Sequence, residues 1–448
     1  MVYNVSTTKQ NTKEILSMKI IPQINMFGES ENKKYLGDLE RLQKVIDFMP
    51  DGKIIRKLRQ IRGNGRNDWE VEPMWNAFLA SFVFEHKNIA DLLRELNRNS
   101  QLREMCGFKA RKINWKSKEE KIMLAPTASS FSNFLKNVQK CQNEIKEAFE
   151  ELTKYMYENL EEFGETLMID GKAIQSYATK NSNNKKAGNR GEKDADWAKK
   201  EYTAYDPKGE KVTKTVKWFG FRLHLIADAK YELPVEYEIT KASNSEVKEA
   251  EKLIKRIKKE KAYKINTCKV FLADRGYDSA KLIELLDEEE IAPVIDIRNM
   301  WKSGEKTKQY RDTDLVYTYD GKVYYVNEKA EKIELLNKGY DNSSKSIRYG
   351  FHPKYKDSRI FRISLKEDRR IFTRIPRNTY KWKRIYKKRT GIERINGRID
   401  RDYGFENHTI RGIEKLKMFI GLTFLVSLTL AKSKIEIGNK NHISALVS

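Results

Sequence analysis

Apolar residues recur at helical spacing through the first third of the chain. The repeat begins at Tyr35 and continues to about Lys140. Thr127 or Ser129 can cap the last short helix of this stretch, and residues 142–162 are typical of one long charged helix. The repeat is clearest in the first helix, at Leu36, Leu39, Leu42, Val45 and Ile46.

This pattern predicts a helical N-terminal domain over residues 35–162, preceded by a polar, poorly ordered segment over residues 1–34. Several short helices joined by tight turns are compatible with a helix-turn-helix-like DNA-binding module. They are equally compatible with a plain helical bundle that supports dimerisation. The pattern alone leaves both interpretations open.

The periodicity changes at Glu165 from helical repeats to strands. ETLMIDGKAI combines a buried apolar run with an expected Asp-Gly turn, while KWFGFRLHLIAD and LPVEYEIT alternate apolar and polar positions. An amphipathic helix over 245–261, the strand CKVFLAD, the helix SAKLIELLDEEE and the strand IAPVIDI follow. This order predicts a mixed sheet whose later strands are parallel and joined by crossover helices. The polar stretch 180–200 is expected to be a mobile loop.

Helical periodicity is absent between residue 298 and about residue 379. LVYTYDGKVYYVN predicts a hairpin with its turn at Asp320-Gly321, and SRIFRISL predicts another strand. We therefore expect an α/β core in two parts, over 163–298 and 380–434, interrupted by a β-rich insertion over 299–379. Residues 435–448 are expected to form a tail.

One apolar stretch resembles a membrane span in composition. Residues 418–431, MFIGLTFLVSLTLA, carry no charge, but 14 residues fall short of the roughly 18–20 that cross a bilayer. A buried core helix is the preferred interpretation. Three widely spaced cysteines form no C-x-x-C pair, and the N-terminus lacks the apolar core of a signal peptide. We expect a cytoplasmic protein with no membrane partner.

The net charge of the chain narrows the class of molecule that it is expected to bind. The chain of 448 residues has 88 Lys and Arg against 64 Asp and Glu, a formal net charge of +24. Between Phe351 and Arg401 there are 18 basic residues and 5 acidic ones, interleaved with aromatic side chains. Basic side chains bind phosphates and aromatic rings stack on bases, so this segment favours nucleic acid as the partner. A solvated basic face and an anionic membrane surface are the alternatives.

Three acidic residues stand out by their local context. Asp170 and Asp274 each end an apolar run that predicts a buried strand, and Glu393 falls in a basic helical segment. Each has an ordinary alternative, since strand-terminal Asp often serves a turn and Glu393 is placed for an i,i+4 pair with Arg389. Together the three supply the oxygen ligands that two Mg²⁺ ions need for phosphodiester cleavage, with Mn²⁺ able to substitute.

These motifs together resemble those of the DDE transposases of bacterial insertion sequences. The resemblance rests on MIDGKAI, FLADRGYDS and the Tyr-x2-Arg-x3-Glu segment, supported by FVFEHKNIADLLRELNRNSQLREMCGF, PTASSFSNFL, EKDADWAKK and WFGFRLHLIAD. It covers about Tyr35 to Ala431 and is specific because the motifs occur in the family's order. It implies a ribonuclease H-like mixed sheet flanked by helices, interrupted by a β-rich insertion and preceded by an all-α N-terminal domain.

The resemblance also implies roles for individual residues. Asp170, Asp274 and Glu393 map to the catalytic, metal-binding triad, and Tyr386 and Arg389 to phosphate contacts. The family pattern has a Lys seven residues after the Glu, where this chain has Asp400. Further DNA contacts are expected from the cations near these motifs: Lys172, Arg275, Lys387, Lys388, and Arg398 and Arg401, which flank Asp400.

Two tryptophans and one histidine have a functional and an ordinary interpretation. Some members of the family hold a flipped base on an aromatic ring, and Trp301 or Trp382 can serve here, with packing as the alternative. His224 lies in an expected strand, where a neutral, packed ring is the default and a role near the metal ions the alternative.

The leading hypothesis is therefore a DNA transposase. It binds terminal inverted repeats, cleaves the element ends and joins the free 3′ hydroxyl to target DNA, as a homodimer on paired ends in the bacterial nucleoid. A transposase-derived DNA-binding regulator without cleavage activity and a standalone metal-dependent nuclease are the alternatives.

Overall fold

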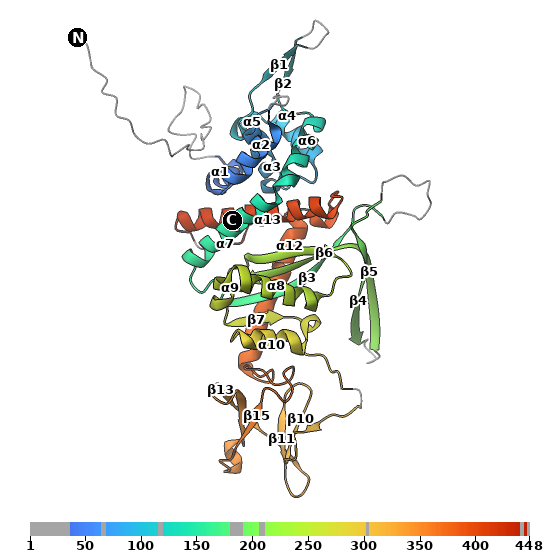
Figure 1. Ribbon diagram of the computed structural model, residues 1–448, viewed down its shortest axis with the longest axis vertical. Coiled ribbons are helices and arrows are strands. Elements are labelled where there is room, and N and C mark those ends of the chain that lie inside the picture. The colour runs from blue at the N-terminus through green and yellow to red at the C-terminus, as the bar shows by residue number, and fades with distance from the viewer. Residues whose placement is uncertain are drawn as a thin grey trace, which may run out of the picture.

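The chain folds into three regions stacked along one axis. The computed structural model describes residues 36–63, 69–114, 120–179, 191–205, 211–301, 304–439 and 443–445. Helices of the N-terminal region lie at one end, an α/β region lies in the middle, and a β-rich region lies at the other end (Figure 1). Mixed α/β architecture with a helical N-terminal region and separate antiparallel sheets confirms the predicted fold class.

Side-chain caps begin several helices of the N-terminal region, among them the predicted cap at Thr127. Thr127 accepts a hydrogen bond from the Ser130 amide at the start of α6, and Asn88 accepts one from the Asp91 amide at the start of α4. A short antiparallel pair, β1 (Arg111–Asn114) and β2 (Glu120–Met123), was not predicted. The helices are α1 (Leu39–Phe48), α2 (Gly52–Arg62), α3 (Val71–Val83), α4 (Ile89–Arg98), α5 (Ser100–Cys106), α6 (Ala128–Val138) and α7 (Gln142–Asn159).

A mixed six-stranded sheet forms the middle region. Antiparallel pairing joins β6, β5 and β3, and parallel pairing joins β3, β7 and β8. The spatial order β6-β5-β3-β7-β8 matches the predicted mixed sheet, but β4 pairs with the first half of β5 and is an addition. The strands are β3 (Thr166–Gln175), β4 (Asp196–Tyr205), β5 (Lys211–Asp228), β6 (Pro234–Lys241), β7 (Val270–Ala273) and β8 (Ala292–Ile295).

Two sequence-based expectations about these strands were wrong. Asp170-Gly171 is not a turn, because β3 continues to Gln175 by pairing with β5 after its parallel pairing with β7 ends at Ile169. The polar stretch 180–200 is not entirely a loop, because its last residues begin β4; residues 180–190 lie outside the described part of the chain. In both cases a long-range strand partner overrides the local turn and loop signals.

Helices cover both faces of the sheet. Figure 1 shows α8 and α10 in front of it and α12 behind it. The helices of this region are α8 (Glu246–Glu260), α9 (Ala262–Thr267), α10 (Ala280–Glu288), α11 (Tyr380–Tyr386), α12 (Thr390–Arg401) and α13 (Ile413–Glu436), and short 3₁₀ turns include Arg275–Tyr277 and Lys387–Arg389.

The apolar stretch near the C-terminus is a buried helix, as predicted, though longer. Helix α13 has 24 residues, and by length and composition alone it could cross a membrane, yet 78% of its most apolar window is buried in the protein. Gly421 lets Ile145 of α7 and Tyr237 of β6 approach its backbone closely. Phe419 packs on Phe78 of α3, so α13 joins the N-terminal helices to the sheet.

The β-rich region contains two antiparallel sheets with their own apolar core. The predicted hairpin joins β10 and β11, with Gly321 at a positive φ of 88° that favours glycine. The four-stranded sheet comprises β9 (Lys308–Gln309), β10 (Leu315–Tyr317), β11 (Val323–Val326) and β12 (Lys332–Glu334), and the three-stranded sheet comprises β13 (Leu336–Asp341), β14 (Ser346–Gly350) and β15 (Ile360–Ser364).

Asp228 ties two turns to the end of β5. Its buried carboxylate accepts hydrogen bonds from the amides of Gly164 at 2.9 Å, Lys230 at 2.9 Å and Tyr231 at 2.6 Å. Burial raises the pKa of Asp228, although these three donors favour the charged form.

We expect Asp228→Ala to lower the free energy of unfolding by about 2–4 kcal/mol, because three buried amides lose their acceptor. Urea-induced unfolding at pH 7, followed by far-UV circular dichroism, measures this. Asp341→Ala is the control, since Asp341 also accepts from a turn amide but water can replace its carboxylate. Equal effects of the two substitutions would contradict the assigned role.

Candidate active site

Asp170 and Asp274 lie side by side at the centre of the sheet. Ile169 of β3 is paired directly with Ala273 of β7, so the next residue of each strand is an aspartate. Burial raises the pKa of Asp170, and the charge of Asp274 raises it further. Asp274 Oδ1 accepts a hydrogen bond from the Gly276 amide at 2.7 Å. The pair concentrates negative charge that favours a bound cation.

Helix α12 brings Glu393 and Asn396 to the face of β3 that carries Asp170. Asn396 Nδ2 donates to Asp170 Oδ2 at 2.9 Å. Glu393 lies one turn earlier on the same face, and its carboxylate accepts from Arg389 at 2.6 Å. The charge of Arg389 lowers the pKa of Asp170, which places the Arg389–Glu393 pair beside the aspartates. Asn396 was not predicted, although its i,i+3 spacing from Glu393 was a usable signal.

Glu246, the first residue of α8, is a fourth carboxylate that sequence reasoning missed. An ideal Cβ on Gly171 would lie 2.7 Å from Glu246 Oε1, and one on Gly276 would lie 2.9 Å from Oε2. The two glycines therefore leave the space that the Glu246 carboxylate occupies, and at Gly276 the Asp274 Oδ1 atom lies closer still, at 2.7 Å. Burial raises the pKa of Glu246, and the charges of Asp274 and Asp170 add to this, while Arg222 at 3.1 Å opposes it. No local pattern distinguishes Glu246 from an ordinary first-turn acid.

The oxygen-bearing side chains of the site are of the kind that binds a hard divalent cation. They do not, however, form a closed set of ligands around one point. Within the described residues, no three His, Cys, Asp or Glu side chains converge closely enough to hold a metal ion. The Tyr277 hydroxyl is fully buried and has no hydrogen-bond partner among the residues that the structure describes. The pKa of Tyr277 is raised by burial and by the charges of Glu246, Asp170 and Asp274, which places it among the acids. Carboxylates and an unsatisfied hydroxyl are oxygen donors of the kind that Mg²⁺ or Mn²⁺ prefers.

Lys172 and Asp400 form an ion pair beside the acids. Lys172 lies two residues after Asp170 on the same face of β3, and its Nζ donates to Asp400 Oδ2 of α12 at 2.5 Å. The Lys172 side chain is 9% exposed and that of Asp400 34%. Asp400, which stands where the family pattern has a Lys, is therefore paired with Lys172 on the strand that faces α12.

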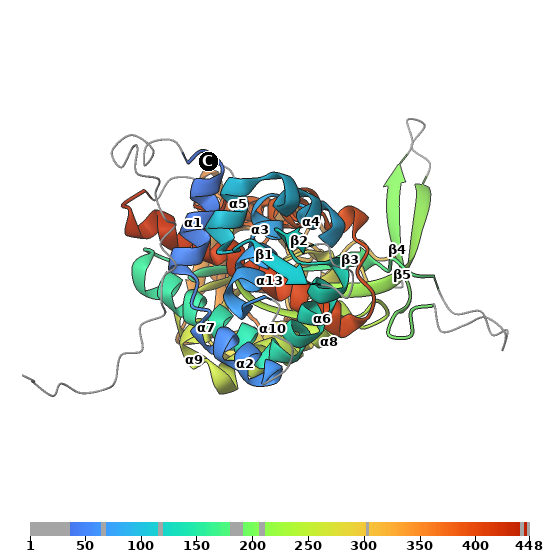
Figure 2. The same cartoon turned by 90° about the horizontal axis from the view of Figure 1, so that it is seen from above.

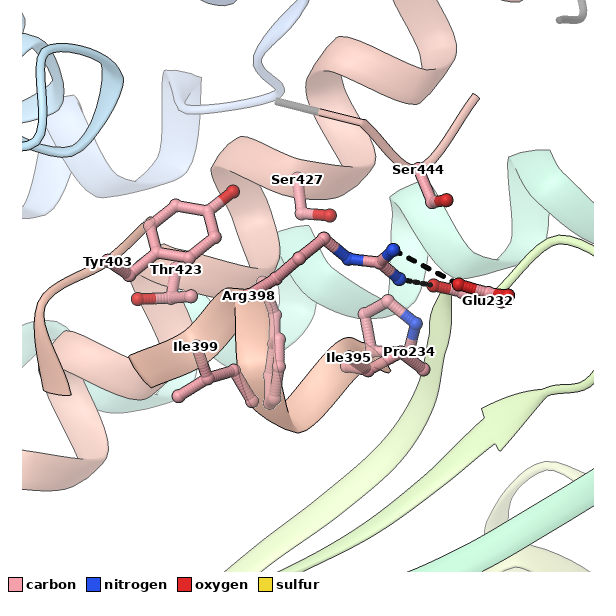
Figure 3. A pocket seen from close by; sticks show the side chains of 10 residues that line it. Glu232, Pro234, Ile395, Arg398, Ile399, Tyr403, Thr423, Ser427 and Ser444 are labelled. Atoms are coloured by element: carbon pink, nitrogen blue, oxygen red, sulfur yellow. Dashed lines mark hydrogen bonds and ion pairs between the residues drawn. The ribbon is translucent and has the colours of Figure 1, made fainter. Parts of the chain in front are cut away.

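Arg398 does not lie with the acids. It binds Glu232 at 3.0 Å on the opposite side of α12, in a small pocket near Pro234 and Ser427 (Figure 3). Arg401 is exposed and donates weakly to the Gly397 carbonyl at 3.4 Å. The structure therefore brings neither arginine into the place of the expected Lys, because that position on the helix face is filled by Asp400.

The remaining predicted phosphate contacts differ in their partners and in how exposed they are. Arg389 packs over the Tyr386 ring at 5.7 Å, and the charge of Asp274 is among those that raise the pKa of Tyr386, after burial. Arg275 pairs with Asp296 at 2.9 Å, and its side chain remains 63% exposed. Lys387 and Lys388 are exposed in the turn between α11 and α12.

The tryptophans and His224 are packed within the chain. Trp382 is buried and stacks on Tyr386, with ring centroids 4.5 Å apart. Trp301 is half-buried against Tyr317 and Tyr319. His224 is buried, hydrogen-bonds Thr240 at 2.9 Å and has its pKa lowered to about 4 by burial, so it is neutral as predicted. Packing therefore accounts for Trp382 and His224.

Residues 162–429 match the model of a family described as the transposase DDE domain. The match spans more than half of the chain, and the chain belongs to this family. Transposases of this family act on DNA and use divalent metal ions. No curated protein sequence matches the chain. Among solved structures it is similar to the cryo-EM structure of the piggyBac transposase synaptic complex with hairpin DNA, at 12% identity and a TM-score of 0.39, over 92% of this chain and 79% of that one.

We expect Asp400→Lys to destabilise the protein by about 1–3 kcal/mol, because it places a second ammonium group against the buried Lys172. Asp400→Asn should cost less, since the amide oxygen still accepts a hydrogen bond. Urea unfolding at pH 7 measures both. Wild-type stability for Asp400→Lys would show that the ion pair contributes nothing.

Proposed function

We propose that the protein is an active DNA transposase that cleaves the ends of its element and joins them to target DNA. The observation that carries this proposal is the placement of Asp170 directly beside Asp274, with Asn396 of α12 hydrogen-bonded to Asp170, in a member of the DDE family. Cleavage and joining are both in-line displacements at phosphorus, with water or a 3′ hydroxyl as the attacking group, so one site can serve both.

Each acid has a distinct part in this proposal. Asp170, Asp274 and Glu393 would hold the divalent ions, and Glu393 would become free to do so if a substrate phosphate replaced it as the partner of Arg389. Asn396 fixes the orientation of Asp170 by its hydrogen bond. Divalent ions held there would activate the attacking oxygen and neutralise the leaving oxygen.

Some of the residues around the acids are proposed to contact the substrate, and others to stabilise the active site itself. Arg389, Tyr386, Arg275, Lys387 and Lys388 are the proposed phosphate contacts. Lys172 acts on the site through its pair with Asp400. Terminal inverted repeats are the proposed DNA, with two copies of the chain on paired ends. The bacterial cytoplasm, at the nucleoid, is the proposed location.

We expect Asp170→Asn, Asp274→Asn and Glu393→Gln each to reduce cleavage by about 10³-fold or more, since each removes a metal ligand worth several kcal/mol in the transition state. The assay uses labelled DNA carrying the native element ends, with Mg²⁺ or Mn²⁺ and a plasmid target. Asp341→Asn in the β-rich region is the matched control.

The same assay separates the alternatives. Binding of end DNA without nicking by the wild-type protein would identify a regulator, and nicking without joining to the plasmid would identify a nuclease. Wild-type cleavage by all three variants would refute the assignment of the site.

We expect Glu246→Gln to weaken Mn²⁺ binding by about 10–100-fold, the range for groups that support metal ligands. Titration calorimetry with Mn²⁺ measures this without DNA. Glu249→Gln, one turn along α8 and paired with Lys252, is the control. Equal affinities of the two variants would remove Glu246 from the metal site.

A further inference from the structure

A two-stranded ribbon projects from the middle region beside the candidate active site. Residues 196–205 of β4 pair with residues 211–220 of β5, and the rest of β5 belongs to the sheet. Figures 1 and 2 both show this ribbon standing away from the body of the protein. Its ten residue pairs span about 30 Å. An isolated ribbon of this kind is marginally stable in water, so its form depends on what holds its base.

The base of the ribbon is fixed to the core at two places. Glu192, just before β4, accepts a hydrogen bond from the Gly412 amide at 2.7 Å, and Asp194 accepts one from Ile413 at 3.4 Å. These acids meet the first amides of α13, where the helix dipole favours negative charge. Asp196 accepts from the Ser243 amide at 2.9 Å, close to the start of α8. The ribbon is therefore held in a set position relative to Glu246 and the aspartates.

One face of the ribbon contributes charge to the candidate active site. Lys200 lowers the pKa of both Asp170 and Glu246 through its positive charge. Residues directly opposite in an antiparallel pair share a face, so Val216, the partner of Lys200, lies on this side. Lys200 on this face is therefore near enough to the acids to interact with their charges.

The other face presents cations and an aromatic ring to solvent. Lys199 lies directly opposite Lys217, and both are exposed. Lys199 also forms an ion pair with Glu201, two residues along the same face, at 3.1 Å. Trp197, on the same face, is 56% exposed and rests on Phe219 at 5.5 Å. The two strand segments contain five Lys against two acids.

We propose that this ribbon binds double-stranded DNA next to the bond that is cut. The inference rests on the proposed function, since it places the DNA by its scissile phosphate. Cations along a fixed arm attract the phosphate backbone, and a two-stranded ribbon has the width of the major groove. The acids repel this polyanion, and Lys200 at their edge lies where the backbone must approach them. The proposed ligand is duplex DNA, which can come from either the element end or the target.

The first experiment measures how DNA affinity depends on salt. We expect Lys199→Ala with Lys217→Ala to reduce the slope of log K against log salt by about 2, one for each lost phosphate contact. Lys255→Ala with Lys259→Ala, two exposed lysines of α8, is the control. Circular dichroism and a thermal melt establish that both variants are folded. A slope equal to that of the control overturns the proposal.

The second experiment locates the DNA. All three native cysteines are buried, so Lys217→Cys can be labelled selectively with an iron–EDTA reagent that cuts nearby DNA. We expect scission within a few base pairs of the cleavage point on end DNA, or of the joining point on target DNA, and the two substrates distinguish these sources. A pattern like that of labelled Lys255→Cys overturns the proposal. Neither readout needs catalysis. If the wild-type protein fails to cleave end DNA while both ribbon experiments succeed, the transposase proposal is refuted and the ribbon proposal stands.

Discussion

Burial of α13 is the interaction on which the rest of the structure depends. This helix is apolar nearly all round, and it contacts α7 and β6 through Gly421 and α3 through Phe419. Burying its nine large apolar side chains contributes on the order of 20 kcal/mol before conformational entropy is counted. The N-terminal helices and the sheet cannot cover their apolar faces without it. Its first amides also hold Glu192 and Asp194, so the same helix sets the base of the ribbon.

The register of the strands determines the geometry of the candidate active site. Parallel pairing of β3 with β7 places Asp170 beside Asp274, and the alternation of β3 turns Asp170 and Lys172 toward α12 and Gly171 toward α8. Glu246 then reaches the acids because two glycines leave space for it. A slip of β3 by one residue would exchange these faces and separate every one of these contacts.

Local sequence pattern was a good guide to elements and a poor guide to their extent. The helices of the N-terminal region, the strands around Asp170 and Asp274, and the hairpin at Gly321 follow from periodicity and turn residues. The sequence could not reveal β4, because its polar composition resembles a loop until β5 pairs with it. Glu246 was hidden for a similar reason: its significance depends on Gly171 and Gly276, which are distant in the chain. Arg398 was misplaced because flanking Asp400 in sequence puts it on the far side of α12.

The ion pair between Lys172 and Asp400 has a consequence for how such proteins diverge. The positive charge lies on the strand and the negative charge on the helix, and the two side chains lie in contact next to the acids. Neither position can change sign alone without bringing like charges together in a partly buried place. The two positions should therefore covary among relatives. Which of the two carries the positive charge would mark separate lineages within the family.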